Sequence, residues 1–496
     1  MNYNYIVIGS GISGLVSAII LAKNGYKVAL IEKSGKTGPL LRGFQRKGIF
    51  FDTGFHHAGG FGKGEIGDIF FRYLGFSDRL IKIPCNPECF DIVRFLNPKF
   101  EFNFPIGYDR IRERLHESFP HDKYATDEYL DTIKKQCASI PYLNLDADFG
   151  SLEVLKALHG PSLREFMDQL TDNDLLKAIL SIHCLLNGVP SHEQALNNYA
   201  YIVGPYYESV HRVYGGGAAI IKEFENALAE AGVDVFCGRA VVEILFSPAS
   251  GLKGVRLQDS TVIESKGCIS TIHPLHLLQI VPHSLFRPAY VTRLKSLEDT
   301  ASAFILYGES DTALDILSGS SIYISPTKCI DFCNIDSALK KRPFYITSIC
   351  PQNGNSDRVG FIAICPASIK ETRQWENSLT GDRSDDYRIF KKGIVERMLR
   401  HIETSCEDLR GKIKPVDCST PLTLRDYTNS PFGSMYGAKH KTEQYNPFPV
   451  TRLPGLFLAG QSIVAPGLLG TIISGFVTCG NILGHDYLRR ELIKCS

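Results

Sequence analysis

The first thirty residues place a glycine-rich turn between two short apolar runs. Residues 4–8 form an apolar run that predicts a buried parallel strand. Residues 15–24 predict a helix with small residues where it meets the sheet, and residues 27–31 predict a second strand. A helix between two buried strands is typical of a parallel sheet, so we expect an α/β fold.

The turn carries a G-x-G-x-x-G motif, and the second strand ends in an acid, Glu32. Gly9 permits the tight turn, Gly11 lets the backbone approach a pyrophosphate, and Gly14 allows close packing of helix and strand. The helix N-terminus then presents N–H groups to the phosphates. Glu32 can accept hydrogen bonds from an adenosine ribose, and its charge disfavours a 2′-phosphate. The pattern therefore predicts a dinucleotide site for FAD or NAD.

The middle of the chain shows two other patterns. Residues 71–205 are mostly helical, with periodic apolar positions in Leu175–Leu186. Residues 281–414 contain strand-like runs at 303–307, 344–347 and 360–364, followed by a helix at 386–403. Together they predict a mixed sheet capped by helices.

Composition narrows the class of protein. The 496 residues carry a net charge of +1, are 44% hydrophobic and contain no run of five like charges. That balance argues against disorder and against nucleic acid as the main partner. The length suggests about two or three domains.

Neither the cysteines nor the apolar runs indicate a metal site or a membrane span. None of the fourteen cysteines has the spacing of a zinc site, so we expect no metal. Residues 456–484 are long enough to cross a membrane, but their six glycines and one proline favour a loop leading into a packed helix. With no signal peptide, we expect a cytoplasmic protein with reduced thiols.

Two further segments point to FAD rather than NAD. Residues 48–60 contain Phe51-Asp52-Thr53-Gly54-Phe55-His56, and residues 454–475 form a strand, a turn at Gly460-Gln461 and a glycine-rich lead into a helix expected near Gly470. With the segment Thr420–Gly437, they resemble FAD-dependent oxidoreductases of the phytoene desaturase, carotenoid isomerase and retinol saturase superfamily. The motifs are most similar to the retinol saturase and carotenoid isomerase branch.

The resemblance implies a Rossmann-like FAD-binding domain interrupted by an α+β substrate domain with an apolar tunnel. FAD-binding segments are expected at 1–70, 206–280 and 415–496, and substrate-domain segments at 71–205, mainly helical, and 281–414, mainly sheet. The expected FAD contacts are Gly9, Gly11, Ile12, Ser13, Gly14, Glu32, Lys33, Arg42, Thr53, Gly54, the backbone of Val241, Gly460, Gln461, Gly470, Thr471 and Ile472. In one departure, Gly38-Pro39 replaces the usual Gly-Gly, which weakens the case for Arg42.

The resemblance predicts hydride transfer through flavin N5 to or from carbon–carbon double bonds of a hydrophobic polyene or isoprenoid-like substrate. His56, Tyr436 and Tyr214 are the proposed catalytic residues, with His57 as a further candidate proton donor. His56 could instead only hydrogen-bond backbone or cofactor, and Arg425 could hold a polar substrate head or lie on the surface.

Several alternatives stay open. Saturation would require a separate electron donor, because no second nucleotide motif is present. The apolar and basic run at 285–295 predicts peripheral membrane contact, although a solvated surface helix explains it equally well. The phenylalanines between Phe50 and Phe76 either fill a core or line a tunnel. A flavin amine oxidase, or an FAD-containing lipid- or prenyl-binding protein without redox turnover, would share the same fold.

Overall fold

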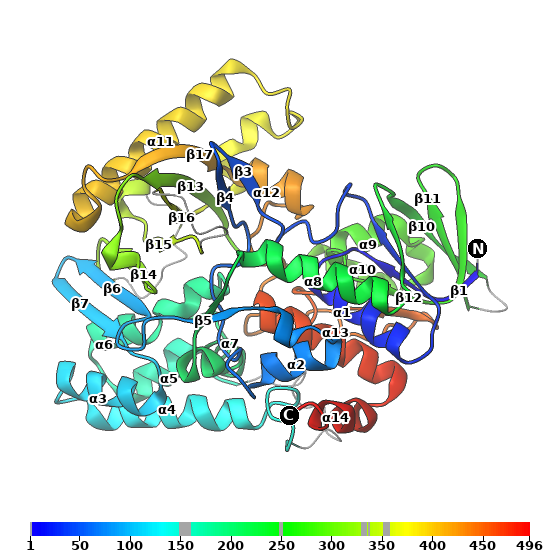
Figure 1. Cartoon of the computed structure of the whole chain (residues 1–496), viewed down its shortest axis with the longest axis horizontal. Helices are drawn as coiled ribbons and strands as arrows, with labels where there is room; N and C mark the ends of the chain where they lie inside the picture. Colours follow the sequence, from blue (N-terminus) through cyan, green and yellow to red (C-terminus); the bar gives the residue numbers. More distant parts are fainter. Residues whose placement is uncertain (1, 148–159, 248–250, 329–334, 336–337, 351–357) are drawn as a thin grey trace.

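The computed structural model describes residues 2–147, 160–247, 251–328, 335, 338–350 and 358–496, which form two sheets with covering helices (Figure 1). The first sheet has the strand order β10-β11-β12-β1-β2-β9, with β18 also paired to β12. Its strands are β1 (Asn2–Ile8), β2 (Val28–Glu32), β9 (Asp234–Cys237), β10 (Val241–Ser247), β11 (Gly251–Leu257), β12 (Val262–Ser270) and β18 (Leu456–Leu458).

The centre of this sheet is parallel and buried on both faces. β1 runs parallel to β2 and β12, with Val7 opposite Leu30 and Ile269. Val7 packs toward α1 and α13, whereas Ile6 and Ile8 pack toward α9 and α10. The uninterrupted apolar run of β1 follows from this two-sided burial. The flanking helices are α1 (Ile12–Lys23), α2 (Ile66–Leu74), α8 (Gly216–Glu230), α9 (Pro274–Ile280), α10 (Pro288–Lys295), α13 (Gly467–Leu483) and α14 (His485–Ile493).

The second sheet is mixed, with the order β17-β13-β16-β15-β14-β6-β7. Its strands are β6 (Asp91–Leu96), β7 (Lys99–Phe104), β13 (Ser302–Ser310), β14 (Ser321–Ser325), β15 (Phe344–Ser348), β16 (Val359–Ala367) and β17 (Lys414–Ser419). Phe304 and Leu306 pack against α11 (Asp385–Ser405). On the other side lie α3 (Tyr108–Ser118), α4 (Lys123–Ala138), α5 (Leu163–Leu170), α6 (Asp174–Leu180), the 3-10 turn η4 (Ile182–Leu186) and α7 (Leu196–Glu208).

Two short hairpins and one helix lie around these sheets. β3 (Phe44–Arg46) pairs with β4 (Ile49–Phe51), and β5 (Lys82–Pro84) pairs with β8 (His211–Val213). Helix α12 (Pro421–Thr428) follows β17. Phe51 of β4 packs against Tyr307 of the second sheet with ring centroids 5.4 Å apart. The segment after β4, which begins at Asp52, therefore starts beside the second sheet.

The α/β fold with two sheets is confirmed, with local corrections. Residues 71–205 also supply β6 and β7 to the mixed sheet. The C-terminal helix begins at Gly467, three residues before the predicted Gly470, because the loop ends at Pro466. Phe51, Phe55, Phe61, Phe70, Phe71 and Phe76 are buried, as expected for a core, while Phe50 is half-buried.

Candidate flavin site

The turn after β1 has the geometry that a dinucleotide phosphate requires. Gly9 has φ +96°, and a Cβ on Gly14 would lie 2.0 Å from the Gly9 carbonyl oxygen. A Cβ on Gly11 would meet nothing within 4 Å, so open space lies beside the backbone there. No side chain caps the start of α1. Its first N–H groups are therefore available to an anion.

Glu32 is fixed by hydrogen bonds from two loops. One carboxylate oxygen accepts from the backbone N–H and the hydroxyl of Ser10, at 2.8 and 2.7 Å, and the other accepts from the N–H of Ser34 at 2.7 Å. The side chain is buried beside the Gly9–Gly14 turn. These contacts hold the carboxylate of Glu32 at the position expected for a ribose acceptor.

The C-terminal helix meets the same turn. The hydroxyl of Ser13 donates to the carbonyl oxygen of Thr471 at 2.7 Å, which joins α1 to α13. Gly460 has φ +124°, and its N–H donates to Ser474 at 2.8 Å. A Cβ on Gly470 would come within 2.9 Å of Ala465, so this glycine packs the loop onto α13. Ile472 is fully buried, and His440 Nε2 donates to the Gln461 carbonyl at 2.6 Å.

The remaining predicted cofactor residues differ in their exposure and in their hydrogen bonds. Thr53 donates to the Leu40 carbonyl, and Gly54 is exposed beside it. The Arg42 guanidinium donates to the Lys36 carbonyl at 2.9 Å. Lys33 is exposed at the end of β2, and Val241 begins β10 opposite Leu257. Whether each contacts a cofactor stays a prediction.

These features fit FAD. The open space at Gly11 and the uncapped start of α1 suit a pyrophosphate, and the fixed Glu32 suits a ribose. Asp52, Thr53 and Gly54 leave β4 and reach α8 of the nucleotide side, where the Gly217 N–H donates to Asp52 at 2.8 Å. Burial raises the pKa of Asp52 to about 7.

The two histidines after this segment lie against the second sheet. His56 has its ring centroid 6.1 Å from that of Tyr345, and His57 Nε2 lies 2.6 Å from the hydroxyl of Tyr206. Burial, and secondarily the Arg212 cation, lowers the pKa of His56 to about 4 and holds the pKa of His57 well below its usual value. Both imidazoles are therefore neutral at neutral pH.

The two predicted catalytic tyrosines differ in their surroundings. The backbone N–H of Tyr436 donates to the Thr300 hydroxyl at 3.1 Å, and its ring lies beside Gly188. Burial raises the pKa of Tyr323, next to the histidines. Tyr323 and Tyr345 have ring centroids 5.0 Å apart. Tyr214 is 36% exposed, and its hydroxyl makes no hydrogen bond to the residues that the structure describes.

Arg425 is held by its own surroundings. Its guanidinium donates to Asp426 at 2.8 Å and to the backbone carbonyl of Glu376 at 2.5 Å. The side chain therefore stabilises the loop beside α12.

Sequence reasoning missed several side chains around the histidines. Arg212 is 7% exposed and donates to Ser348, Thr347 and the Ser320 carbonyl at 2.8, 3.2 and 3.1 Å. Tyr206, Tyr345, Asp91 and His183 lie close by. Asp91 in the apolar run after Phe90 was the available signal, because a charged residue in a buried strand requires a partner.

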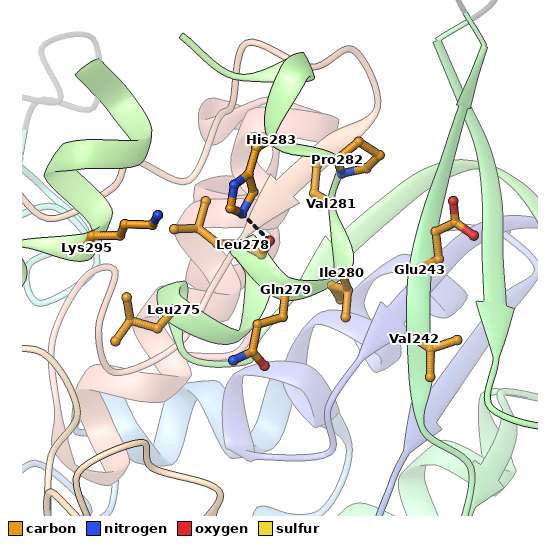
Figure 2. A pocket seen from close by; sticks show the side chains of 10 residues that line it. All are labelled: Val242, Glu243, Leu275, Leu278, Gln279, Ile280, Val281, Pro282, His283 and Lys295. Carbon is orange, nitrogen blue, oxygen red and sulfur yellow. Dashed lines mark hydrogen bonds between the residues drawn. The ribbon is translucent and has the colours of Figure 1, made fainter. Parts of the chain in front are cut away.

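A groove on the outside of the first sheet is separate from these residues (Figure 2). It lies between β10 and α9 and is lined by Val242, Glu243, Leu275, Leu278, Gln279, Ile280, Val281, Pro282, His283 and Lys295. His283 Nε2 lies 2.9 Å from the Leu278 carbonyl and closes one side. None of the predicted site residues lines it.

In the neighbouring run at 285–295, most residues are exposed, but several of its larger apolar side chains pack inward. Leu294 is fully buried, Phe286 is 8% exposed, and Tyr290 packs against the core of the first sheet. Leu285, 39% exposed, is the large apolar side chain of the run that faces solvent. Peripheral membrane contact of this run stays a prediction. Among the described residues, no helix is long and apolar enough to cross a membrane.

Comparison with known proteins identifies the relatives. The human all-trans-retinol 13,14-reductase is 25% identical over 98% of this chain and 86% of its own. Prolycopene isomerase 2 of an Oncidium hybrid is 24% identical over 98% and 84%, and the 4,4′-diapophytoene desaturase of Staphylococcus haemolyticus is 23% identical over 92% and 93%.

Solved structures show the same fold. An oxidoreductase from Methanosarcina mazei superposes with a TM-score of 0.66 at 14% identity, covering 96% of this chain and 99% of its own. Putrescine oxidase bound to putrescine superposes with a TM-score of 0.64 at 15% identity, covering 97% and 99%. Residues 12–483 match the flavin containing amine oxidoreductase family. The chain therefore belongs to this family, and it is an FAD-dependent oxidoreductase.

Proposed function

We propose that this enzyme saturates, isomerises or desaturates carbon–carbon double bonds of a hydrophobic polyene or isoprenoid-like substrate. The observation that carries the proposal is similarity along nearly the whole chain to proteins named for retinol reduction, prolycopene isomerisation and diapophytoene desaturation. Saturation or isomerisation is favoured, because the retinol reductases and the isomerase cover 98% of this chain.

The site residues support chemistry on an uncharged substrate. When bound, FAD supplies or accepts the hydride at N5. His56 and His57 are neutral at physiological pH, and Tyr323, Tyr345 and Tyr206 surround them with aromatic rings. Such a lining orients an apolar polyene and excludes water. Tyr436 and Tyr214 remain proposed catalytic residues; Tyr436 is held by Thr300, whereas Tyr214 is exposed.

The hydride and the proton of a saturation must come from different sources. A neutral His56 with its pKa near 4 carries no imidazolium proton at pH 7. The proton therefore has to come from another group in the site or from solvent. The electrons would come from a separate reductase.

The test is a product analysis. FAD-loaded protein is reduced chemically without oxygen, mixed with a panel of polyenes, and the products are separated and weighed by mass spectrometry. Saturation adds two hydrogen atoms, isomerisation leaves the mass unchanged but shifts the retention time, and desaturation by the oxidised enzyme removes two hydrogen atoms.

The outcomes separate the alternatives. Peroxide release with amines, and no changed polyene, would replace the proposal with an amine oxidase. Stoichiometric polyene binding with an unreactive flavin would indicate a lipid-binding protein instead. A Gly11→Ala variant, expected to keep the fold and to fill the phosphate space, serves as the control with weakened FAD binding.

A further inference from the structure

A buried chain of hydrogen bonds leads from His57 into the helical side of the second sheet. His57 Nε2 lies 2.6 Å from the Tyr206 hydroxyl, which donates to Asp91 Oδ2 at 2.8 Å. His183 Nε2 lies 3.0 Å from the same carboxylate oxygen. Tyr206 is 3% exposed, and Asp91 and His183 are fully buried. Four chain segments that are distant in sequence thus meet in one polar chain.

The directions of these bonds fix the histidine tautomer. The Tyr206 hydroxyl uses its proton on Asp91, so its oxygen accepts the proton of His57 Nε2. His57 Nδ1 then carries a lone pair, and the Tyr345 hydroxyl lies 3.4 Å from it. Long contacts of this kind are common in sites without substrate. Tyr345 also lies 3.1 Å from Ser321 Oγ and is half-buried at the end of the chain.

Asp91 is only half satisfied. Its Oδ2 accepts from Tyr206 and His183, whereas Oδ1 is buried with no hydrogen-bond partner among the described residues. A buried carboxylate oxygen without a partner carries a desolvation cost, and a proton bound by the carboxyl group would remove it. The titratable groups that face it are Tyr206 and Tyr207 on α7, His183 on η4, Tyr323 on β14, Tyr345 on β15 and the nearby Cys85 and Cys89.

We propose that Asp91 is the proton reservoir of the site and that Tyr206, His57 and Tyr345 connect it to the substrate. This inference rests on the proposed function, because it assigns the proton of that reaction. The hydrogen bonds from His57 through Tyr206 point toward Asp91, which is the proton-accepting state, while the Tyr345 hydroxyl lies within reach of both His57 Nδ1 and Ser321 Oγ. If Asp91 is protonated, all of them reverse, and the same chain donates.

The steps balance in both directions. In saturation, the Asp91 O–H bond breaks as its proton passes to Tyr206, whose own proton moves to His57 Nε2. The Nδ1 proton of His57 moves to Tyr345, and the Tyr345 hydroxyl proton forms the new C–H bond on the substrate carbon. FAD, when bound, would supply the hydride. Desaturation returns one proton along the same path and leaves Asp91 protonated.

The chain offers a matched pair of variants. Tyr206→Phe removes the connecting hydroxyl and keeps the ring. Tyr201→Phe removes a hydroxyl from the same helix, where the Tyr201 oxygen is buried with no hydrogen-bond partner among the described residues. Asp91→Asn keeps the shape of the side chain and removes the proton acceptor. Both tyrosine variants are expected to fold and bind FAD.

The first measurement reads the tautomer without activity. Protein with ¹⁵N-labelled histidine rings is loaded with FAD, and His57 is assigned by comparison with His57→Gln. We expect a single Nε2–H form in the wild type and in Tyr201→Phe, and a mixture of tautomers in Tyr206→Phe. An unchanged His57 signal in Tyr206→Phe would overturn the inference.

The second measurement reads the proton step in a single anaerobic turnover with a polyene that the wild type transforms. We expect Tyr206→Phe and Asp91→Asn to slow product formation at least ~10-fold with substrate binding unchanged, and Tyr201→Phe to match the wild type. Wild-type rates in the first two variants would overturn the relay. If the wild type transforms no polyene, the proposed function fails, and the histidine spectra alone decide for or against the chain.

Discussion

The hydroxyl of Ser13 donates a hydrogen bond of 2.7 Å to the carbonyl oxygen of Thr471, across 458 residues of sequence. It ties the start of α1 to the first turns of α13, and neither helix has a side-chain cap. The uncapped N-termini of the two helices are therefore held together at the nucleotide turn.

Loss of this bond should loosen the cofactor site. We expect Ser13→Ala to weaken FAD binding by about 1 kcal/mol, or roughly fivefold, because one buried hydrogen bond is lost. Titration of the apoprotein with FAD, followed by fluorescence, measures this. Ser17→Ala is the control, since the Ser17 hydroxyl bonds to the Ser13 carbonyl within the same helix. Equal affinities of both variants would contradict the assigned role.

The open space beside Gly11 predicts a variant that folds but loses FAD. A Cβ there meets no protein atom within 4 Å, and the backbone, with φ −62°, suits alanine. We expect Gly11→Ala to melt like the wild-type apoprotein and to bind FAD at least ~10-fold more weakly, because the methyl group occupies the phosphate space.

Two other glycine variants serve as controls for Gly11→Ala. Gly14→Ala should destabilise the fold by about 1–3 kcal/mol, because its Cβ would lie 2.0 Å from the Gly9 oxygen. Gly393 lies in α11, and a Cβ added there would meet nothing within 4 Å. Gly393→Ala should therefore leave FAD binding unchanged and should not destabilise the fold. FAD binding of normal strength by Gly11→Ala would place the phosphates elsewhere.

Asp52 should make the protein less stable as the pH rises. Its pKa is about 7 in the fold against 3.8 in the unfolded chain, so its contribution is present below pH 3.8 and is lost as the pH rises through 7. Asp52→Asn cannot ionise, and its amide oxygen can still accept from Gly217. We expect the variant to gain about 2–3 kcal/mol more over the wild type at pH 8 than at pH 5.

Denaturant unfolding at the two pH values measures the gain. The exposed Asp382→Asn is the control and should show no such difference. A pH-independent difference between Asp52→Asn and the wild type would show that Asp52 titrates normally.

His56 should affect the pH dependence of stability in the opposite direction to Asp52. Its pKa is lowered from 6.5 to about 4, so its contribution to stability is present above pH 6.5 and is lost as the pH falls through 4. His57 is shifted in the same direction. Between pH 6.5 and pH 4, the wild type should lose about 3 kcal/mol of unfolding free energy because of His56. His56→Gln should lose that much less over the same pH range. Exposed His121→Gln should leave that loss unchanged, and an equal loss in both variants would contradict the buried neutral state.

Most elements around the Gly9–Gly14 turn could be predicted from the sequence. The run at residues 4–8 and the acid at Glu32 lie in β1 and β2 as predicted, because buried parallel strands are apolar throughout and the glycines follow fixed backbone needs.

The second sheet and the residues around His56 and His57 were harder to predict from the sequence. β6 and β7 were missed among helices because six-residue strands such as Asp91–Leu96 leave a weak periodic signal. The contacts of Asp91 with Tyr206 and His183 join residues 92 to 115 positions apart, and no local pattern records such meetings. His56 was found through its motif, whereas its neighbour Tyr345 comes from a strand with no distinctive motif.

The most direct test of the central claim follows the polyene itself. FAD-loaded enzyme is reduced without oxygen and mixed with each member of a polyene panel, and the absorption band of the polyene is recorded with time. We predict that the band of at least one polyene shifts with the wild type and stays fixed with Gly11→Ala. Unchanged bands for every polyene, together with bleaching of the oxidised flavin by an amine, would contradict the account.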